Sequence, residues 1–280
     1  MFSEIVVIKS GGDLGSAVAH RLVQSGFPVI ITEKPQPLSI RRRVSFSEAV
    51  YHGETMVEGV VAKIGSREEP EEILGLCKKG MIPVVVDENL DILTKIAASV
   101  VIDATLRKKN VDMHLGLALI TIALGPGFIA PKEVDAVIET NRGHHLGRIY
   151  YRGEAMENTG VPGMIEGVSR KRVIYSPQIG FFRGLKSIGE LVKKGEPIGV
   201  VHDNRENREE TTPILAPVDG MIRGLIPEGI LLSKGMKIGD VDPRGERASC
   251  DLISDKGRTI SGGVLEAILH LLFEKKMRDG

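Results

Sequence analysis

Hydrophobic positions in the first half of the chain form short continuous runs, and the stretches between them have helical spacing. Residues 5–8 and 29–31 are apolar runs rich in β-branched side chains, and Leu14, Val18 and Leu22 lie between them on one helix face. Similar apolar runs, which we interpret as later strands, occupy residues 84–86, 100–102, 118–124 and 136–138. Apolar strands that alternate with helices are typical of a parallel sheet covered on both faces. The pattern therefore predicts an α/β domain with a Rossmann-like parallel sheet over residues 1–170.

The second half of the chain has a different pattern, because helical periodicity disappears between about residues 172 and 243. Residues 177–201 align without a gap on residues 217–241, and 12 of the 25 positions are identical. Neither copy is long enough to bury a core alone, so we expect the two copies to close one small β structure. The doubled unit resembles a barrel-sandwich hybrid of the biotinyl/lipoyl type, which we expect over residues 171–245.

The segment that joins the two copies, residues 202–210, contains no lysine. In biotinyl and lipoyl modules the modified lysine lies on this hairpin, so we expect no covalent biotin or lipoyl group. Residues 246–280 form a C-terminal segment, in which residues 263–269 predict an amphipathic helix.

Charge and composition exclude several classes of function. The 37 basic and 37 acidic residues balance, so the chain has no net charge to attract nucleic acid or an anionic membrane. Cys77 and Cys250 form no framework, and no Cys/His cluster has the spacing of a metal site. The longest apolar run, residues 115–124, is too short to cross a bilayer, and no leader segment opens the sequence. We therefore expect a cytoplasmic protein without a metal, without nucleic-acid or membrane partners, and with its oligomeric state open.

A glycine turn follows the first predicted strand. Gly11, Gly12, Asp13 and Gly15 connect it to the first helix, and Glu33 ends the second strand 18 residues after Gly15. Glycines allow close approach of a phosphate, and an acidic residue at this place binds ribose hydroxyls in dinucleotide-binding folds. The turn is either a nucleotide site or a tight packing turn, and we favour the nucleotide site.

Other candidate residues cluster after later strands. Asp103 and Thr105 follow one strand, and this part of the chain resembles the cofactor domain of sirohaem-type dehydrogenases. Residues 138–147 follow another strand and supply Glu139, Asn141, Arg142 and His144. Asp103, Glu139 and His144 are the candidate catalytic residues, although His144 and His145 also fit a simple surface pair.

Two arginines complete the set of candidate residues. Arg42 and Arg43 follow the second predicted strand and are candidate anion ligands, for example for a 2′-phosphate; a solvated charge run is equally compatible with them. The candidate cofactor-binding residues are thus Gly11, Gly12, Asp13, Gly15, Glu33, Arg42, Arg43, Asp103, Thr105, Asn141 and Arg142.

Four blocks of sequence, residues 7–14, 42–50, 138–144 and 237–244, occur in one order and together resemble the YqeB-like accessory family of the selenium-dependent molybdenum hydroxylase system. Ser10-Gly11-Gly12 stands where we expect Gly-Ala-Gly. The first domain also resembles, distantly, a part of XdhC-type molybdenum-enzyme chaperones. The resemblance implies a role in the maturation or insertion of the selenium centre, with a molybdenum hydroxylase as the client protein.

Three hypotheses follow. The first is an accessory factor that binds NAD(P) or another nucleotide and assists maturation of a molybdenum hydroxylase. The second is an NAD(P)-dependent oxidoreductase that uses the same glycine turn for hydride transfer. The third is a non-catalytic adaptor whose glycine turn holds no ligand.

Overall fold

The computed structural model describes residues 2–157, 166–168, 170–202 and 211–278. The chain divides into two compact units. Unit 1 consists of Met1–Pro37, Val44–Thr159 and Ile253–Gly280, and unit 2 consists of Leu38–Arg43 and Gly160–Leu252. The segment 203–210, for which the sequence predicts no biotin or lipoyl attachment, lies outside the described residues.

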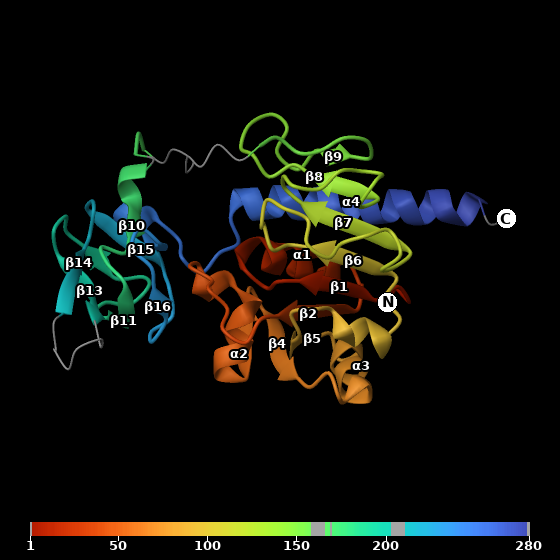
Figure 1. Cartoon of the computed structure of the whole chain (residues 1–280), viewed down its shortest axis with the longest axis horizontal. Coiled ribbons are helices and arrows are strands. Elements are labelled where there is room, and N and C mark those ends of the chain that lie inside the picture. Colours follow the sequence, from red (N-terminus) through yellow and green to blue (C-terminus); the bar gives the residue numbers. More distant parts are fainter. Residues whose placement is uncertain (1, 158–165, 169, 203–210, 279–280) are drawn as a thin grey trace. The chain divides into compact units, whose positions relative to one another are not determined.

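Unit 1 is built on one sheet, which has nine strands within the described residues, in the order β3-β4-β5-β2-β1-β6-β7-β8-β9 (Figure 1). The strands are β1 (Val6–Lys9), β2 (Val29–Glu33), β3 (Glu54–Val57), β4 (Val60–Gly65), β5 (Ile82–Val86), β6 (Val100–Asp103), β7 (Ile120–Leu124), β8 (Ala136–Ile138) and β9 (Ile149–Tyr150). The helices of unit 1 are α1 (Asp13–Gln24), α2 (Ala49–His52), α3 (Pro70–Lys78) and α4 (Asp255–Arg278). Short 3-10 turns are η1 (Arg42–Val44), η2 (Phe46–Glu48), η3 (Asp91–Thr94), η4 (Arg170–Arg172) and η5 (Gly245–Arg247).

The predicted fold, a Rossmann-like parallel sheet followed by a barrel-sandwich hybrid module, is wrong, because the large sheet is mixed. β3 pairs antiparallel with β4, and β9 pairs antiparallel with β8 at the opposite edge. Glu58 and Gly59 join β3 to β4 with φ values of 45° and 82°, the positive pair that a two-residue hairpin turn requires. Both antiparallel strands are short and only partly buried, so they lack the continuous apolar run that marks the other strands.

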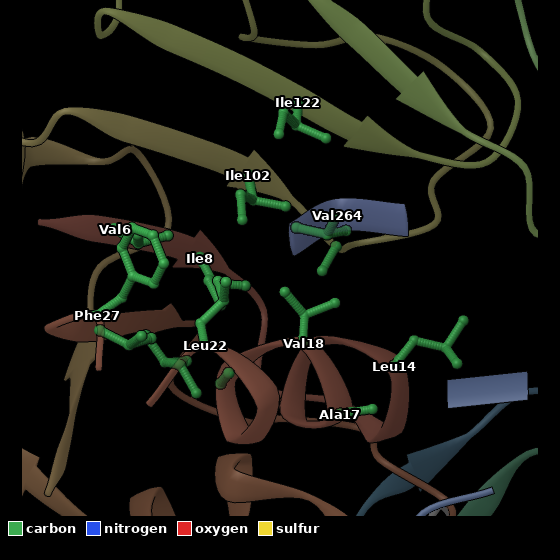
Figure 2. Close-up of a cluster of buried hydrophobic side chains, with 14 of the residues drawn as sticks. Val6, Ile8, Leu14, Ala17, Val18, Leu22, Phe27, Ile102, Ile122 and Val264 are labelled. Atoms are coloured by element: carbon green, nitrogen blue, oxygen red, sulfur yellow. The ribbon is translucent and has the colours of Figure 1, made fainter. Parts of the chain in front are cut away.

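The two faces of the sheet bury different sets of side chains. Figure 2 shows the face covered by α1 and α4, where Val6 and Ile8 of β1 meet Leu14 and Val18 of α1 and Val264 of α4. On the other face, α3 and the loops after β5 and β7 cover the alternate strand residues, such as Val7, Ile30 and Val101. Because successive side chains of a strand point to opposite faces of the sheet, the position of a residue in its strand determines the face from which its side chain projects.

Unit 2 contains two four-stranded sheets among its described residues, with strand orders β10-β17-β15-β12 and β14-β13-β11-β16. Its strands are β10 (Val173–Tyr175), β11 (Gly180–Gly184), β12 (Leu191–Val192), β13 (Pro197–His202), β14 (Thr211–Leu215), β15 (Gly220–Leu225), β16 (Leu231–Leu232) and β17 (Lys237–Asp242). The 40-residue repeat is visible in these bounds, because β11, β12 and β13 correspond to β15, β16 and β17. The short strand of each copy pairs with a strand of the other copy, since β12 pairs with β15 and β16 pairs with β11.

Both copies of the repeat therefore contribute to one core, which contains Phe182 and Ile198 from the first copy and Ile222 and Ile238 from the second. Among the helices described, none combines the length and apolar character that crossing a membrane requires.

Candidate functional site

The candidate site is a cleft at the carboxyl ends of the central strands of unit 1. β1 is followed by β2 on one side and has β6 on its other side, so the order of strands reverses at β1. Ligands of open α/β sheets bind at such reversals, outside the carboxyl ends of the strands. A cleft of about 500 Å³ occupies this place and is lined by Lys9, Ser10, Thr32, Glu33, Lys34, Asp87, Glu88, Asn89, Thr105, Arg107, Val111 and Asp112.

Three side chains in adjacent strands form a polar row beside the cleft. Lys9 of β1 lies in register with Thr32 of β2 and with Asp103 of β6, so all three project from the same face of the sheet. Lys9 and Thr32 line the cleft, and Asp103 is buried next to them. The ammonium group of Lys9 is buried and forms an ion pair with Asp112, which comes from the long segment between β6 and β7. The row thus places a buried cation between a hydroxyl and two carboxylates.

The glycine turn lies next to this polar row, and hydrogen bonds to the carboxylate of Glu33 hold the turn in place. One carboxylate oxygen of Glu33, Oε2, accepts hydrogen bonds from the Gly11 N–H at 2.9 Å and from the Ser10 hydroxyl at 3.3 Å. The other oxygen accepts the Lys34 N–H at 3.0 Å. Ser10 has φ of 80°, a left-handed backbone that glycine adopts without strain, and it stands where the family resemblance leads one to expect glycine. Gly15 packs closely, because a Cβ there would lie 2.1 Å from the carbonyl oxygen of Ser10.

Asp103 is a buried carboxyl whose neighbours partly offset its burial. Burial raises the pKa of Asp103 above its usual 3.8, and hydrogen bonds from Thr105 and the nearby charges of Lys9 and Arg107 act in the opposite direction. Its Oδ1 accepts the Thr105 N–H at 2.8 Å and the Thr105 hydroxyl at 2.6 Å. Asp103 and Thr105 therefore lie together at the end of β6, where Thr105 lines the cleft and the buried Asp103 is not among the lining residues.

The raised pKa makes the contribution of Asp103 to stability depend on pH. The folded state holds this proton more tightly than the unfolded state, so stability falls as pH rises above 3.8 and through the folded pKa. We expect Asp103→Asn to be more stable than the wild type at pH 7 and equally stable below pH 3.8. Urea unfolding of both proteins between about pH 3 and pH 7 measures the difference in their free energies of unfolding. A difference that is the same at all pH values would contradict a raised pKa of Asp103.

A second group of charged residues lies at the end of β8 and the start of α4. Glu139 is fully buried and accepts the N–H groups of Asn141 at 2.7 Å and Met156 at 2.9 Å. The guanidinium group of Arg142 donates to both carboxylate oxygens of Asp255, at 2.7 and 3.0 Å. Glu139 thus fixes the start of the loop after β8, and Arg142 of the same loop joins it to α4, which comes from the far end of the chain.

Lys256, in the first turn of α4, belongs to this second group, and the sequence reasoning missed it. Burial lowers the pKa of Lys256, and the charges of Asp13, Arg142, Glu139 and Asp255 also act on it. Asp13 of the glycine turn therefore has the ammonium group of Lys256 near it. A cation in the first turn of a helix interacts unfavourably with the helix dipole, so a lysine at this position is the sequence feature that could have identified Lys256 as a candidate.

His144, Arg42 and Arg43 are not among the residues that line the cleft. His144 is exposed on the loop after β8. Arg42 and Arg43 belong to unit 2, whereas Glu33 belongs to unit 1. Within unit 2, Arg43 donates to the carbonyl oxygen of Ile188 and, at 3.2 Å, to Asp251.

Neither cysteine has the environment of an activated thiol. Cys77 is buried, and its burial raises the pKa of the thiol to about 11. Burial and Asp251 raise the pKa of Cys250. Across the residues the structure describes, no group of three or more His, Cys, Asp or Glu side chains could hold a metal ion.

Comparison with known proteins gives one relative with high sequence identity. The chain is 45% identical over 271 residues to a protein of Escherichia coli K12 whose name is "Uncharacterized protein YqeB". The match covers 97% of this chain and 48% of the relative, so the chain spans about half the length of that protein. This similarity confirms the YqeB-like part of the resemblance. No protein-family model matches the chain.

Solved structures give weaker similarities. A succinylglutamate desuccinylase/aspartoacylase from Rhodobacter sphaeroides is 22% identical over 26% of this chain and 22% of its own, with a TM-score of 0.24. The ectoine utilization protein EutE (DoeB) from Ruegeria pomeroyi is 11% identical over 85% of each chain, with a TM-score of 0.29. An aspartoacylase family protein from Mesorhizobium loti is 10% identical over 85% of this chain and 84% of its own, with a TM-score of 0.28. These TM-scores are too low for the likeness to assign a fold or an activity.

Proposed function

We propose that this chain binds a nucleotide or dinucleotide in the cleft at the carboxyl ends of the central strands, which we call the sheet-edge cleft. The similarity to YqeB extends over 97% of this chain. The position of the cleft carries this proposal: it lies where the strand order reverses, beside a glycine turn that begins a helix. Its volume of about 500 Å³ is within the usual range for small-molecule sites. NAD(P) is the ligand class that the glycine turn favours most, with other nucleotides as alternatives.

The second part of the proposal is that the chain is an accessory factor for selenium-dependent molybdenum hydroxylases. Its role there is to assist the maturation or insertion of the selenium centre in a client enzyme. The support is the resemblance of four sequence blocks to the YqeB-like accessory family, together with the identity to YqeB of 45%.

Ligand-dependent stabilisation tests the first part. We expect NAD, NADP, ATP, AMP or a molybdenum-pterin nucleotide, at saturating concentration, to stabilise the full chain by about 2 kcal/mol or more. Thermal shift and titration calorimetry measure the effect. Gly12→Val, at the N-cap of α1, should abolish it, and Asp91→Asn, which alters an exposed ion pair with Arg67 outside the cleft lining, should leave it unchanged. Absence of any shift with all five compounds would favour the adaptor hypothesis.

Deletion of the gene tests the second part. We expect the molybdenum hydroxylase client to fold but to lack selenium and activity. A client with normal selenium content and activity would contradict the proposal. Turnover of NAD(P)H by the purified chain with a small substrate would instead favour the oxidoreductase hypothesis.

A further inference from the structure

The floor of the sheet-edge cleft contains buried polar atoms that lack partners. The hydroxyl oxygen of Thr32 and the Oδ1 oxygen of Asp112 are both buried, and neither has a hydrogen-bond partner among the described residues. Thr32 is fully buried, and Lys9 beside it is 3% exposed. Buried hydroxyl and carboxylate groups nearly always have partners, because an unmet group loses its hydrogen bonds to water on burial. Both atoms belong to residues that line the cleft, so a ligand can satisfy them.

Lys9 adds unmet donors to the same place. Its ammonium group has three N–H donors, and within the described part of the chain its hydrogen-bond partner is the Oδ2 oxygen of Asp112. Thr32 is the neighbour of Lys9 across the strand pair β1–β2. The floor therefore offers donors from Lys9, an acceptor on Asp112, and a hydroxyl on Thr32 that can do either.

The charges around the cleft favour an uncharged group at this floor. Three cationic side chains, Lys9, Lys34 and Arg107, line the cleft together with four acidic ones, Glu33, Asp87, Glu88 and Asp112. Asp103 adds a further carboxyl next to Lys9. A phosphate placed against Lys9 would lie close to two carboxyl groups. A hydroxyl, in contrast, donates to Asp112 and accepts from Lys9 without adding charge.

Glu33 is less suited to this role than the sequence predicts. Its Oε2 oxygen is engaged by Gly11 and Ser10, and its Oε1 oxygen is engaged by Lys34. It follows Thr32 in the strand, so its side chain leaves the sheet on the opposite face, toward the glycine turn. Asp112, whose buried Oδ1 oxygen has no hydrogen-bond partner among the described residues, is an acceptor with unmet capacity next to Lys9.

We propose that Lys9, Thr32 and Asp112 form a subsite for a pair of neighbouring hydroxyl groups, the ribose diol of a nucleotide. One hydroxyl donates to Asp112 Oδ1 and accepts from Lys9, and the other pairs with the hydroxyl of Thr32. This inference deepens the proposed function and rests on it only in taking the diol from a nucleotide. The assignment moves recognition of the ribose from Glu33 to Asp112, a residue far along the chain in the segment between β6 and β7.

Titration calorimetry of the full chain with three probes tests the subsite. The probes are AMP, 2′,3′-dideoxy-AMP and ribose 5-phosphate. Because hydrogen bonds to charged groups are lost with the diol, we expect AMP to bind roughly tenfold to hundredfold more tightly than the dideoxy compound. Asp112→Asn should reduce this preference to near unity. Asp91→Asn, the same chemical change outside the cleft lining, should retain it.

Thr32→Val provides a second test, because it should raise the melting temperature of the free protein and lower its preference for AMP. Valine has the shape of threonine and removes an unpartnered buried hydroxyl, so the melting temperature without ligand should rise. The preference for AMP over its dideoxy analogue should fall at the same time. A lower melting temperature would show that the hydroxyl already has a partner in the free protein and would overturn the assignment.

The outcomes separate this inference from the proposed function. Equal binding of AMP and dideoxy-AMP by the wild type overturns the diol subsite and leaves the nucleotide site in place. Binding of ribose 5-phosphate that depends on Asp112, without binding of AMP, supports the subsite and contradicts the nucleotide. No binding of any probe overturns the diol subsite, and the nucleotide site is then decided by the stabilisation measurements with NAD, NADP, ATP, AMP and a molybdenum-pterin nucleotide.

Discussion

Arg172→Met should lower the free energy of unfolding by about 3–5 kcal/mol, because it removes the cation that is hydrogen-bonded to a buried carboxylate. An Nη1 atom of Arg172 lies 2.6 Å from Oδ2 of Asp240, and the two side chains are 9% and 6% exposed. Asp240 is in β17, which pairs with β10 immediately after Arg172, so the ion pair joins the entry of the chain into unit 2 to its central sheet. Urea unfolding of the full chain, followed by circular dichroism, measures the loss.

The double variant Arg172→Met/Asp240→Leu distinguishes two contributions to the free energy of unfolding. One is the cost of a buried carboxylate whose partner has been removed, and the other is the net contribution of the intact ion pair. Replacement of both partners by apolar residues of similar size should recover most of the stability that the single variant loses. Lys193→Met changes an exposed ion pair with Asp219 and should leave the unfolding midpoint unchanged. A single variant as stable as the wild type, or a double variant as unstable as the single one, would contradict this account.

Two adjacent glycines of α4 should respond to alanine in opposite directions. A Cβ at Gly263 would lie 2.2 Å from the carbonyl oxygen of Gly147, a backbone atom that cannot turn away. Gly263→Ala should therefore destabilise unit 1 by about 1–3 kcal/mol, the usual cost of overpacking. Thermal and urea unfolding measure this loss.

Gly262→Ala is the matched control for this prediction. A Cβ at Gly262 meets no atom within 4 Å, and alanine favours the helix by about 0.5–1 kcal/mol over glycine. Gly262→Ala should therefore be more stable than the wild type. Equal effects of the two substitutions would mean that α4 does not pack against the loop after β8 as described.

The sequence predicts the central strands well because their signal is local. Continuous apolar runs predict β2, β6 and β8, and the structure confirms them. The hairpin β3–β4 was missed because its strands are short and half-exposed, so its residues show neither a continuous apolar run nor a long alternation. The Glu58-Gly59 turn was the signal that could have revealed it.

Prediction of the candidate site reaches only as far as local motifs do. The glycine turn, Glu33, Asp103 and Thr105 are candidates in the sequence because they lie next to strand ends. The contact of Lys9 with Asp112, 103 residues away, depends on tertiary structure. The placement of Lys256 near Asp13 likewise depends on how α4 packs on α1. No local pattern carries either pairing, which is why both were missed.

The return of the chain to unit 1 after unit 2 has a consequence for biosynthesis. The core of unit 1 includes Ile260, Val264 and Ile268 of α4, which follow the whole of unit 2 in the sequence. During translation, all the strands of unit 2 therefore leave the ribosome before the large sheet of unit 1 acquires the helix that covers part of one face. Until α4 emerges, that apolar face stays uncovered, so nascent chains that stall between residues 252 and 272 present a hydrophobic surface to chaperones.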